Sequence, residues 1–401
     1  MEVLQIDPQP EAALAVPAVE PEQARLLPRV LGQLGDPRRG STLLCVAGLH
    51  GNEPSGLLGV QAVLEALASE DDALKGCLVG LSGNRQALAE GRRFIDRDLN
   101  RVWRKEEIER VRNSGGSFAV SEDGELADLE REVRRVLEAA QGRVFLLDLH
   151  STSAPGPAFV VFEDTLPNRE FALAFPVTLV LGIEEELEGT LSAYSAELGM
   201  TTVGFEAGQH DDPASVQGAA AAVWIALAAA GVVSSGRPEV RAARRRLKSE
   251  RRDAPHVVEV RHRHAVAPAG GFRMLPDFVS FQPVEEGELL AKNSSGPIHA
   301  PGSGRILMPL YQEQGEDGFF IVRSVRPLWL GLSAAVRRLR LERIVHWLPG
   351  VRRDPGAAGT TFDVDTHVAR WYTLQLFHLL GFRRTAYDER WLRMRRRRHD
   401  R

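Results

Sequence analysis

Residues 42–56, TLLCVAGLHGNEPSG, combine a strand, a loop and the start of a helix. Residues 42–47 form a short apolar run typical of a buried strand, and residues 54–67 carry apolar side chains at helical spacing. The loop between them contains His50 and Glu53. Such a loop lies at the carboxyl edge of a sheet, where open α/β proteins place their sites. We therefore predict that His50 and Glu53 belong to a functional site.

The same alternation continues along the chain. Apolar patterns predict further strands at residues 77–81, 143–149, 158–162, 177–181 and 201–205, and helices at 125–140, 190–198 and 214–230. Strands interleaved with helices indicate an α/β fold, a mostly parallel mixed sheet with helices on both faces. We expect this catalytic domain to occupy residues 41–235.

The rest of the chain is expected to form four further parts, because 401 residues exceed the roughly 250–300 that one core supports. These are a lead-in at 1–40 with a helix at 21–34, a basic linker or solvated helix at 236–255, a small all-β domain at 256–328, and a helical Arg-rich C-terminal extension at 329–401. In the extension, residues 330–347 and 367–380 have helical spacing. From residue 331 onward the chain has 16 Arg, no Lys and 7 acidic residues, a net charge of +9.

Composition excludes several classes of protein. Hydrophobic residues at 43% and charged residues at 26% are typical of globular chains. No apolar run approaches the roughly 20 residues of a membrane span, and the start lacks a basic signal region, so we expect a cytoplasmic protein without membrane contact. Cys45 and Cys77 lie in strand-like runs and are expected in the core. A whole-chain charge of −4 argues against a nucleic-acid partner despite the basic end.

Two further strand ends carry polar residues, Asp148 and His150 in DLHST and Glu206 in GFEAG. Two His and one Glu form the three-ligand set of catalytic zinc, which leaves one position open for water. Asp148 lies on the same strand face as His150 and is expected either to support that ligand or to bind nearby arginines. Glu206 suits a general base acting on the water.

Residues 91–103, GRRFIDRDLNRVW, are dense in charge yet include Phe, Ile, Leu and Trp. Such a segment is expected to be held against the domain, where guanidinium groups recognise carboxylates and stabilise an oxyanion. The alternative is a surface helix start with ordinary ion pairs.

Taken in order, HGNE, Asn84, Arg93, the DLNR at residues 98–101, DLHST and GFEAG resemble the succinylglutamate desuccinylase/aspartoacylase family of the zinc carboxypeptidase superfamily. The resemblance runs from about residue 43 to 208 and more weakly to about 325. It implies a zinc carboxypeptidase-like fold with one zinc ion per chain. The implied roles are zinc ligands for His50, Glu53 and His150, a proton shuttle for Glu206, polarisation of the scissile carbonyl for Arg93, binding of the substrate carboxylate for Asn100 and Arg101, and a pocket-lining position for Asn84.

The chain departs from the aspartoacylase pattern in two places. Residues 190–205 lack the Arg that grips a side-chain carboxylate, and Phe319 and Phe320 stand where a Tyr of the β domain is expected. N-acetylaspartate is therefore a poor candidate substrate, and we expect N-acyl derivatives of neutral amino acids to be preferred.

The expected function is that of a zinc-dependent amidohydrolase acting on an N-acyl amino acid or a related small carboxylate. One alternative is a zinc carboxypeptidase acting on a short peptide, although a β domain that narrows the entrance excludes long peptides. The other is a binding or scaffold protein with structural zinc, against which Glu206 argues, because a structural site needs no free carboxylate beside it. A homo-oligomer is compatible with either class.

Overall fold

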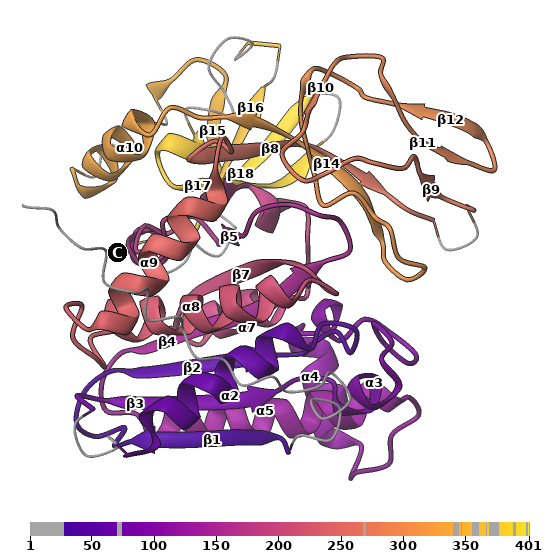
Figure 1. Ribbon diagram of the computed structural model, residues 1–401. Coiled ribbons are helices and arrows are strands. Elements are labelled where there is room, and N and C mark those ends of the chain that lie inside the picture. Colours follow the sequence, from indigo (N-terminus) through magenta and orange to yellow (C-terminus); the bar gives the residue numbers. More distant parts are fainter. Residues whose placement is uncertain are drawn as a thin grey trace, which may run out of the picture.

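One large mixed sheet runs through the molecule (Figure 1). The computed structural model describes residues 28–69, 74–267, 270–339 and parts of 345–400. The eleven described strands of this sheet have the order β1-β3-β2-β4-β7-β5-β6-β8-β14-β13-β10. Their bounds are β1 Val30–Gly35, β2 Thr42–Ala47, β3 Cys77–Ser82, β4 Val144–Thr152, β5 Phe159–Val161, β6 Thr178–Leu181, β7 Thr201–Gln209, β8 Val257–Ala265, β10 Pro283–Val284, β13 Gly304–Leu307 and β14 Asp317–Ser324.

The strands β3, β2, β4 and β7 are parallel, which brings their carboxyl ends to one edge. The antiparallel pairs are β1 with β3 and β7 with β5, together with the successive pairs from β8 through β14 and β13 to β10. The described helical segments are α2 Ser55–Leu67, α3 Arg85–Glu90, η2 Leu99–Arg101, α4 Lys105–Asn113, α5 Ser121–Ala139, α6 Leu166–Ala172, η3 Ile183–Glu185, α7 Leu191–Glu197, α8 Pro213–Ala229, α9 Pro238–Arg251 and α10 Leu328–Arg338.

Alternate residues of β2 build the two halves of the core. Leu43, Cys45 and Ala47 pack in the cluster that contains α2 and α8, whereas Leu44 and Val46 pack in the cluster that contains α4, α5 and α7. Every residue of β2 is buried, as expected of a strand covered on both faces. The predicted α/β fold with helices on both faces is confirmed, and Cys45 and Cys77 are buried free thiols.

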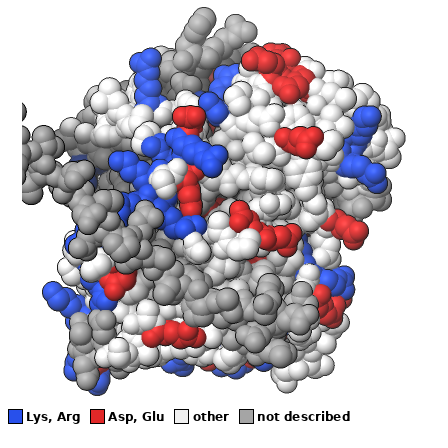
Figure 2. Space-filling model, in the orientation of Figure 1, with Lys and Arg blue, Asp and Glu red and all other residues white. Residues whose placement is uncertain are grey.

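Two expectations near the edges of this domain need correction. Residues 30–34, expected at the end of a helix, form β1, whose pairing with β3 satisfies their backbone groups; residues 21–27 lie outside the described part. Of the two alternatives for 236–255, the helix is correct and the linker is wrong, because residues 238–251 form α9, which buries Val240, Ala243 and Leu247 beside α8 and leaves most of its basic side chains exposed. Figure 2 shows Lys and Arg gathered on this face, where α9 lies in Figure 1.

The β-rich segment continues the large sheet, because β8 pairs in parallel with β6. A separate three-stranded sheet has the order β12-β11-β9, with bounds β9 Arg273–Met274, β11 Leu289–Asn293 and β12 Gly296–His299. The all-β expectation for residues 256–328 therefore describes the strands of this segment. The segment is not separate from the catalytic sheet, because hydrogen bonds between β8 and β6 join the two.

The helical prediction for the C-terminal extension is correct at its start, where α10 (Leu328–Arg338) forms, but it missed the strands that follow. After α10 the chain forms a four-stranded antiparallel sheet in the order β15-β16-β18-β17, with bounds β15 Val351–Arg353, β16 Thr361–Asp365, β17 Phe382–Tyr387 and β18 Trp391–Arg396. Alternating buried residues, Phe362 and Val364 in β16 and Leu392 and Met394 in β18, fill its core. Of the helix expected at 330–347, residues up to 338 are α-helical, residues 345 and 347 have 3-10 geometry, and residues 340–344 and 346 lie outside the described part. Of the helix expected at 367–380, residues 377–379 are helical and residues 369–376 lie outside the described part.

Candidate metal centre and active site

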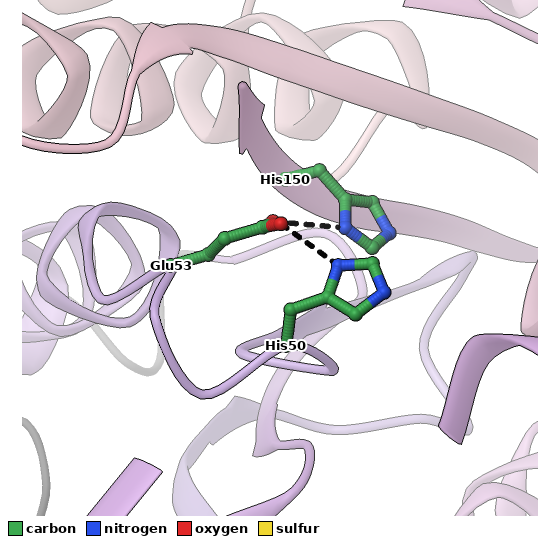
Figure 3. Close-up of side chains that lie close together, drawn as sticks. All are labelled: His50, Glu53 and His150. Atoms are coloured by element: carbon green, nitrogen blue, oxygen red, sulfur yellow. Dashed lines mark hydrogen bonds and ion pairs between the residues drawn. The ribbon is translucent and has the colours of Figure 1, made fainter. Parts of the chain in front are cut away.

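His50, Glu53 and His150 meet at the carboxyl edge of the sheet (Figure 3). His50 and Glu53 come from the loop after β2, and His150 lies near the end of β4. Nδ1 of His50 is 2.8 Å from Glu53 Oε1, and Nδ1 of His150 is 3.1 Å from Glu53 Oε2. All three side chains are buried, with 4%, 2% and 7% of each residue exposed. The structure thus brings together the three residues that the sequence predicted as ligands.

Each histidine has a second carboxylate on its other nitrogen. Nε2 of His150 is 3.1 Å from Asp148 Oδ1, and Nε2 of His50 is 3.1 Å from Asp98 Oδ1. Carboxylates in this position orient a ligating imidazole and raise its basicity. Asp148 was expected to support His150 in this way. Asp98 was not predicted as a site residue, although its position in the DLNR motif beside Asn100 and Arg101 could have indicated it.

Electrostatics favour a cation among these groups. Burial alone would raise the pKa of Glu53, but the adjacent His50 and His150 hold that pKa well below its usual value. Burial would lower the pKa of His150, whereas Asp148 and Glu53 together raise it well above the usual range. In both cases the attraction between carboxylates and imidazoles outweighs desolvation, so the carboxylates of the cluster stabilise positive charge among them.

The donor set suits a zinc ion. A tetrahedral ion with bonds of about 2.1 Å separates its ligand atoms by about 3.4 Å. The three ligand atoms here all lie within 4.8 Å of one another. The two distances from Nδ1 to oxygen are 2.8 and 3.1 Å, so they would have to increase only slightly to admit the ion. Two imidazoles and one carboxylate also match the chemistry of catalytic zinc sites.

Glu206 stands beside the cluster on β7, directly opposite His150 in the parallel pair β4 and β7. Its Oε2 atom is buried and has no hydrogen-bond partner among the described residues. Burial is the main cause that raises the pKa of Glu206 to about 8, against the opposing charge of His150. An unpartnered carboxylate with a pKa near neutrality can both take up and release a proton.

Arg93 also lies at the cluster, since its Nη1 is 3.5 Å from Glu53 Oε1. Its Nε and Nη2 donate to Asp98 Oδ2 at 3.3 and 3.0 Å. Burial would lower the pKa of Arg93, but Asp98 and Glu53 raise it, so the guanidinium is held charged. The segment at 91–103 is therefore fixed to the site rather than an ordinary surface helix start.

The segment that carries Arg93 and Asp98 is pinned by a buried carboxylate from α5. Glu122 is 0% exposed and accepts hydrogen bonds from the backbone N–H groups of Ile95, Asp96 and Arg97 at 2.7 to 3.2 Å. It also accepts from Asn84 Nδ2 at 3.0 Å. The sequence analysis missed Glu122, because α5 lies 22 residues or more from the segment it holds and no local pattern joins them.

Asn84 links α3 to Glu122. Its Oδ1 accepts from Ala87 N and so caps α3, while its Nδ2 donates to Glu122. Both polar atoms are thus engaged within the chain and the residue is 0% exposed, so Asn84 braces Glu122 and α3, and its pocket-lining position stays a prediction.

Asn100 and Arg101 follow Asp98 in η2. Asn100 Nδ2 is 3.4 Å from His150 Nε2, and its Oδ1 accepts from Leu191 N at 2.9 Å. Arg101 donates from Nη2 to Asp317 Oδ2 at 2.8 Å. Both residues lie by the cluster as expected, but Arg101 already binds a carboxylate of this chain.

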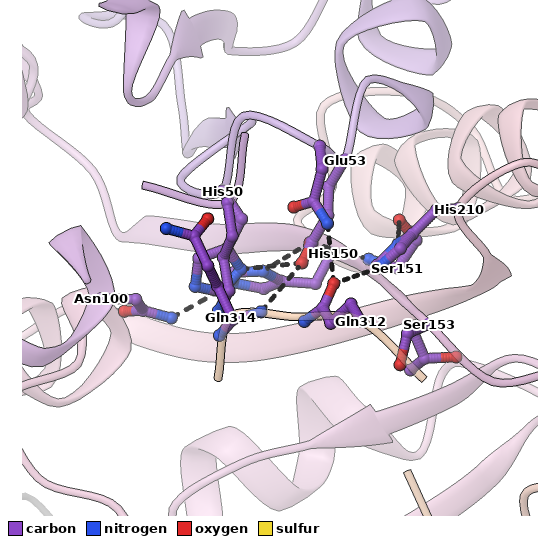
Figure 4. Close-up of polar contacts among 12 residues, drawn as sticks. His50, Glu53, Asn100, His150, Ser151, Ser153, His210, Gln312 and Gln314 are labelled. Carbon is purple, nitrogen blue, oxygen red and sulfur yellow. Dashed lines mark hydrogen bonds and ion pairs between the residues drawn. The ribbon is translucent and has the colours of Figure 1, made fainter. Parts of the chain in front are cut away.

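The loop between β13 and β14 reaches the site from the β-rich segment (Figure 4). Gln312 Oε1 accepts from Asn52 Nδ2 at 2.7 Å and lies 3.1 Å from His210 Nε2. His210 Nδ1 is in turn 2.8 Å from the hydroxyl of Ser151, the residue after His150. Gln314 donates to the carbonyl of Phe94 at 3.1 Å. No sequence pattern linked these residues, which are brought together from five parts of the chain, at positions 52, 94, 151, 210 and 312–314.

An α/β sheet that carries two His and one Glu beside a buried free carboxylate is typical of metal-dependent hydrolases. Residues 39–225 match the family model described as the succinylglutamate desuccinylase/aspartoacylase catalytic domain. Over these residues the chain therefore matches the catalytic domain of the succinylglutamate desuccinylase/aspartoacylase family, in agreement with the resemblance.

Known relatives agree with this assignment. A succinylglutamate desuccinylase of Pseudomonas fluorescens (strain Pf0-1) is 30% identical over 112 residues, which cover 28% of this chain and 31% of that protein. The chain thus matches less than a third of that relative's length.

Solved structures show the same fold. A succinylglutamate desuccinylase/aspartoacylase from Rhodobacter sphaeroides has a TM-score of 0.53 and 16% identity, covering 73% of this chain and 88% of that one. The product-bound ectoine utilization protein EutE (DoeB) from Ruegeria pomeroyi has a TM-score of 0.51 and 20% identity, covering 73% and 87%. None of the described helices is long and apolar enough to cross a bilayer.

Proposed function

We propose that this protein is a zinc-dependent amidohydrolase that cleaves the acyl bond of an N-acyl amino acid or a related small carboxylate. The observation that carries the proposal is the buried, unpartnered Oε2 of Glu206 on the strand next to His150. A structural metal site gains nothing from such a group, since an unpaired buried carboxylate is costly. Its presence favours a hydrolase over a scaffold protein.

In the proposed mechanism His50, Glu53 and His150 hold the zinc ion. The ion supplies a Lewis acid that lowers the pKa of water and polarises a carbonyl. Glu206 accepts the proton of the attacking water at its free oxygen and delivers it to the leaving amine. Arg93, held charged by Asp98, donates to the oxygen on which negative charge develops. Asp98 and Asp148 keep the two imidazoles in position.

The loop that bears Gln312 and Gln314 supports a small substrate rather than a peptide chain. Contacts from this loop to Asn52 and Phe94 hold it beside the cluster, and we infer that it covers the side from which the substrate enters. A carboxypeptidase acting on a longer peptide would need that side open. This favours the amidohydrolase over the carboxypeptidase alternative.

A screen of N-acyl amino acids with zinc-reconstituted protein, detecting free amine, tests the proposal. The control is Glu206→Gln, which we expect to keep its zinc and its fold and to lose turnover by about 100-fold or more, the usual contribution of a general base. Full activity of that variant at neutral pH would remove Glu206 from the mechanism. Absence of turnover with every N-acyl amino acid in the wild type would contradict the proposed reaction.

A further inference from the structure

A cluster of three charged residues borders the site and has no part in the steps above. Arg101 of η2 and Arg263 of β8 both donate to Asp317 at the start of β14. Arg101 Nη2 is 2.8 Å from Asp317 Oδ2, and Arg263 Nε is 2.5 Å from Asp317 Oδ1. The three side chains are 15%, 22% and 16% exposed, so they are mostly shielded but reachable from solvent.

The cluster adjoins the space beside the metal ligands. Arg101 Nη1 donates to the carbonyl of Asn100 at 2.9 Å, and Asn100 Nδ2 lies 3.4 Å from His150 Nε2. Asp317 is also close enough to Arg93 to be among the carboxylates that raise its pKa against the effect of burial. The charge of this cluster would therefore act electrostatically on a small molecule bound at His150.

The charge of the cluster differs from that expected from the sequence. From the sequence, Arg101 was the one arginine expected to bind the substrate carboxylate, because residues 190–205 contain no second Arg. The structure supplies a second guanidinium, Arg263, from a strand far along the chain, and cancels one of the two charges with Asp317. Arg101 Nε also lies 3.9 Å from Glu316 Oε2, but the Glu316 side chain is 58% exposed, so solvent screens its charge. The formal sum of the three shielded residues is +1. Such a cluster balances one bound carboxylate and leaves a second one unpaired.

We propose that Asp317 and Arg263 determine substrate specificity: together with Arg101 they accept one carboxylate and reject a substrate with two. This inference rests on the proposed function and narrows its substrate class to N-acyl amino acids with uncharged side chains. The physical reason is that an unpaired charge in a shielded site loses its hydration without gaining a partner. Asp317 acts by neutralising Arg101, not by contact with the reacting atoms.

The test compares kcat/KM for N-acetylmethionine and N-acetylaspartate. We expect the wild type to prefer N-acetylmethionine by about tenfold or more. Asp317→Asn raises the formal charge to +2 and should lower that preference by about tenfold, through a smaller KM for N-acetylaspartate. Arg263→Gln lowers the charge to zero and should raise KM for N-acetylmethionine. The double variant restores +1 and should regain the wild-type preference.

Glu313→Gln is the matched control, because Glu313 is an exposed residue of the adjoining loop and the substitution removes the same charge. We expect it to leave the preference within about twofold of the wild type. A purely structural role of Asp317 would lower kcat/KM for both substrates alike. An unchanged preference in Asp317→Asn, with wild-type zinc content, would therefore overturn the inference.

Calorimetric binding separates this inference from the reaction. If the zinc-loaded wild type binds N-acetylmethionine but hydrolyses no N-acyl amino acid, the proposed function fails while the charge selectivity is still measured as a ratio of affinities. Equal affinities for the two ligands in the wild type and in Asp317→Asn, or no binding of either ligand, would overturn the selectivity as well.

Discussion

At the scale of single residues, the site is organised by carboxylates that hold imidazoles. Glu53 faces Nδ1 of both histidines, and Asp98 and Asp148 face their Nε2 atoms. Each imidazole is thus fixed from two sides before any ion binds. This preorganisation lowers the cost of assembling the three ligands.

Asp98→Asn should weaken zinc binding by about 10- to 100-fold, because a neutral amide supports the His50 imidazole less than a carboxylate does. The substitution leaves the cap of η2 in place, since Asn caps helices as well as Asp does. Competition with a chelator measures the affinity. His150→Ala is the reference for loss of a ligand, and His299→Ala, at an exposed histidine, is the control that should bind normally. Wild-type affinity in Asp98→Asn would refute the supporting role.

At the scale of elements, the position of Asp98 depends on α5. Glu122, in the first turn of that helix, accepts three backbone N–H groups of residues 95–97 and the amide of Asn84. One buried side chain thus satisfies a loop that has no regular hydrogen bonding of its own there. The active-site segment is attached to the helix layer through this carboxylate.

Glu122→Gln should lower the free energy of unfolding by about 2–4 kcal/mol, because the amide nitrogen replaces an oxygen that accepts from two backbone groups. It should also weaken zinc binding, since Asp98 follows the pinned segment directly. Urea denaturation and chelator competition measure the two effects. Asp128→Asn, an exposed position on the same helix, is the matched control. Unaltered stability of Glu122→Gln would show that these hydrogen bonds are readily replaced.

At the scale of the whole molecule, the C-terminal extension docks on the catalytic sheet through buried charges. Arg337 of α10 binds Asp164 and Asp400, and Arg397 binds Glu184 and Glu185. His378 lies 3.1 Å from Glu185 Oε1 of η3 and 3.0 Å from Glu259 Oε1 of β8. The high Arg content of this segment therefore serves contacts within the chain as well as its solvated surface.

His378 should make stability depend on pH. Burial would lower the pKa of His378, but Glu185 and Glu259 outweigh both burial and the charge of Arg397 and raise that pKa to about 9. Because the folded pKa exceeds the unfolded value of about 6.5, the stabilisation is complete below that pH and is lost as the pH rises through 9.

We expect the free energy of unfolding to fall by up to about 1.4 kcal/mol per pH unit between pH 6.5 and 9 on account of this residue. Denaturation at several pH values in that window measures the slope. His378→Gln should flatten the slope, and His299→Gln should leave it unchanged. Identical slopes in the wild type and His378→Gln would contradict the assignment.

The local sequence pattern was sufficient to predict much of the catalytic domain. The strands and helices of the catalytic domain, and the placement of His50, Glu53, His150 and Glu206, follow from apolar periodicity and from the rule that parallel strands end at one edge. Both depend on residues close together in the chain. That is why the main strands and helices and the grouping of His50, Glu53 and His150 could be predicted, whereas β1 was expected to be helical and α3, α4 and α6 were not predicted.

The remaining features depend on contacts between distant segments. Glu122 holds residues 95–97, Gln312 reaches His210, and Arg263 meets Arg101 at Asp317 only after β8 and β14 have joined the large sheet. In the C-terminal extension, the strands β15 to β18 lie outside the two stretches with helical spacing, and their apolar side chains are buried by cross-strand packing between segments far apart in the chain. Nothing in a local pattern specifies which distant charge a side chain will meet. The charge of the substrate site is therefore a property of the folded chain.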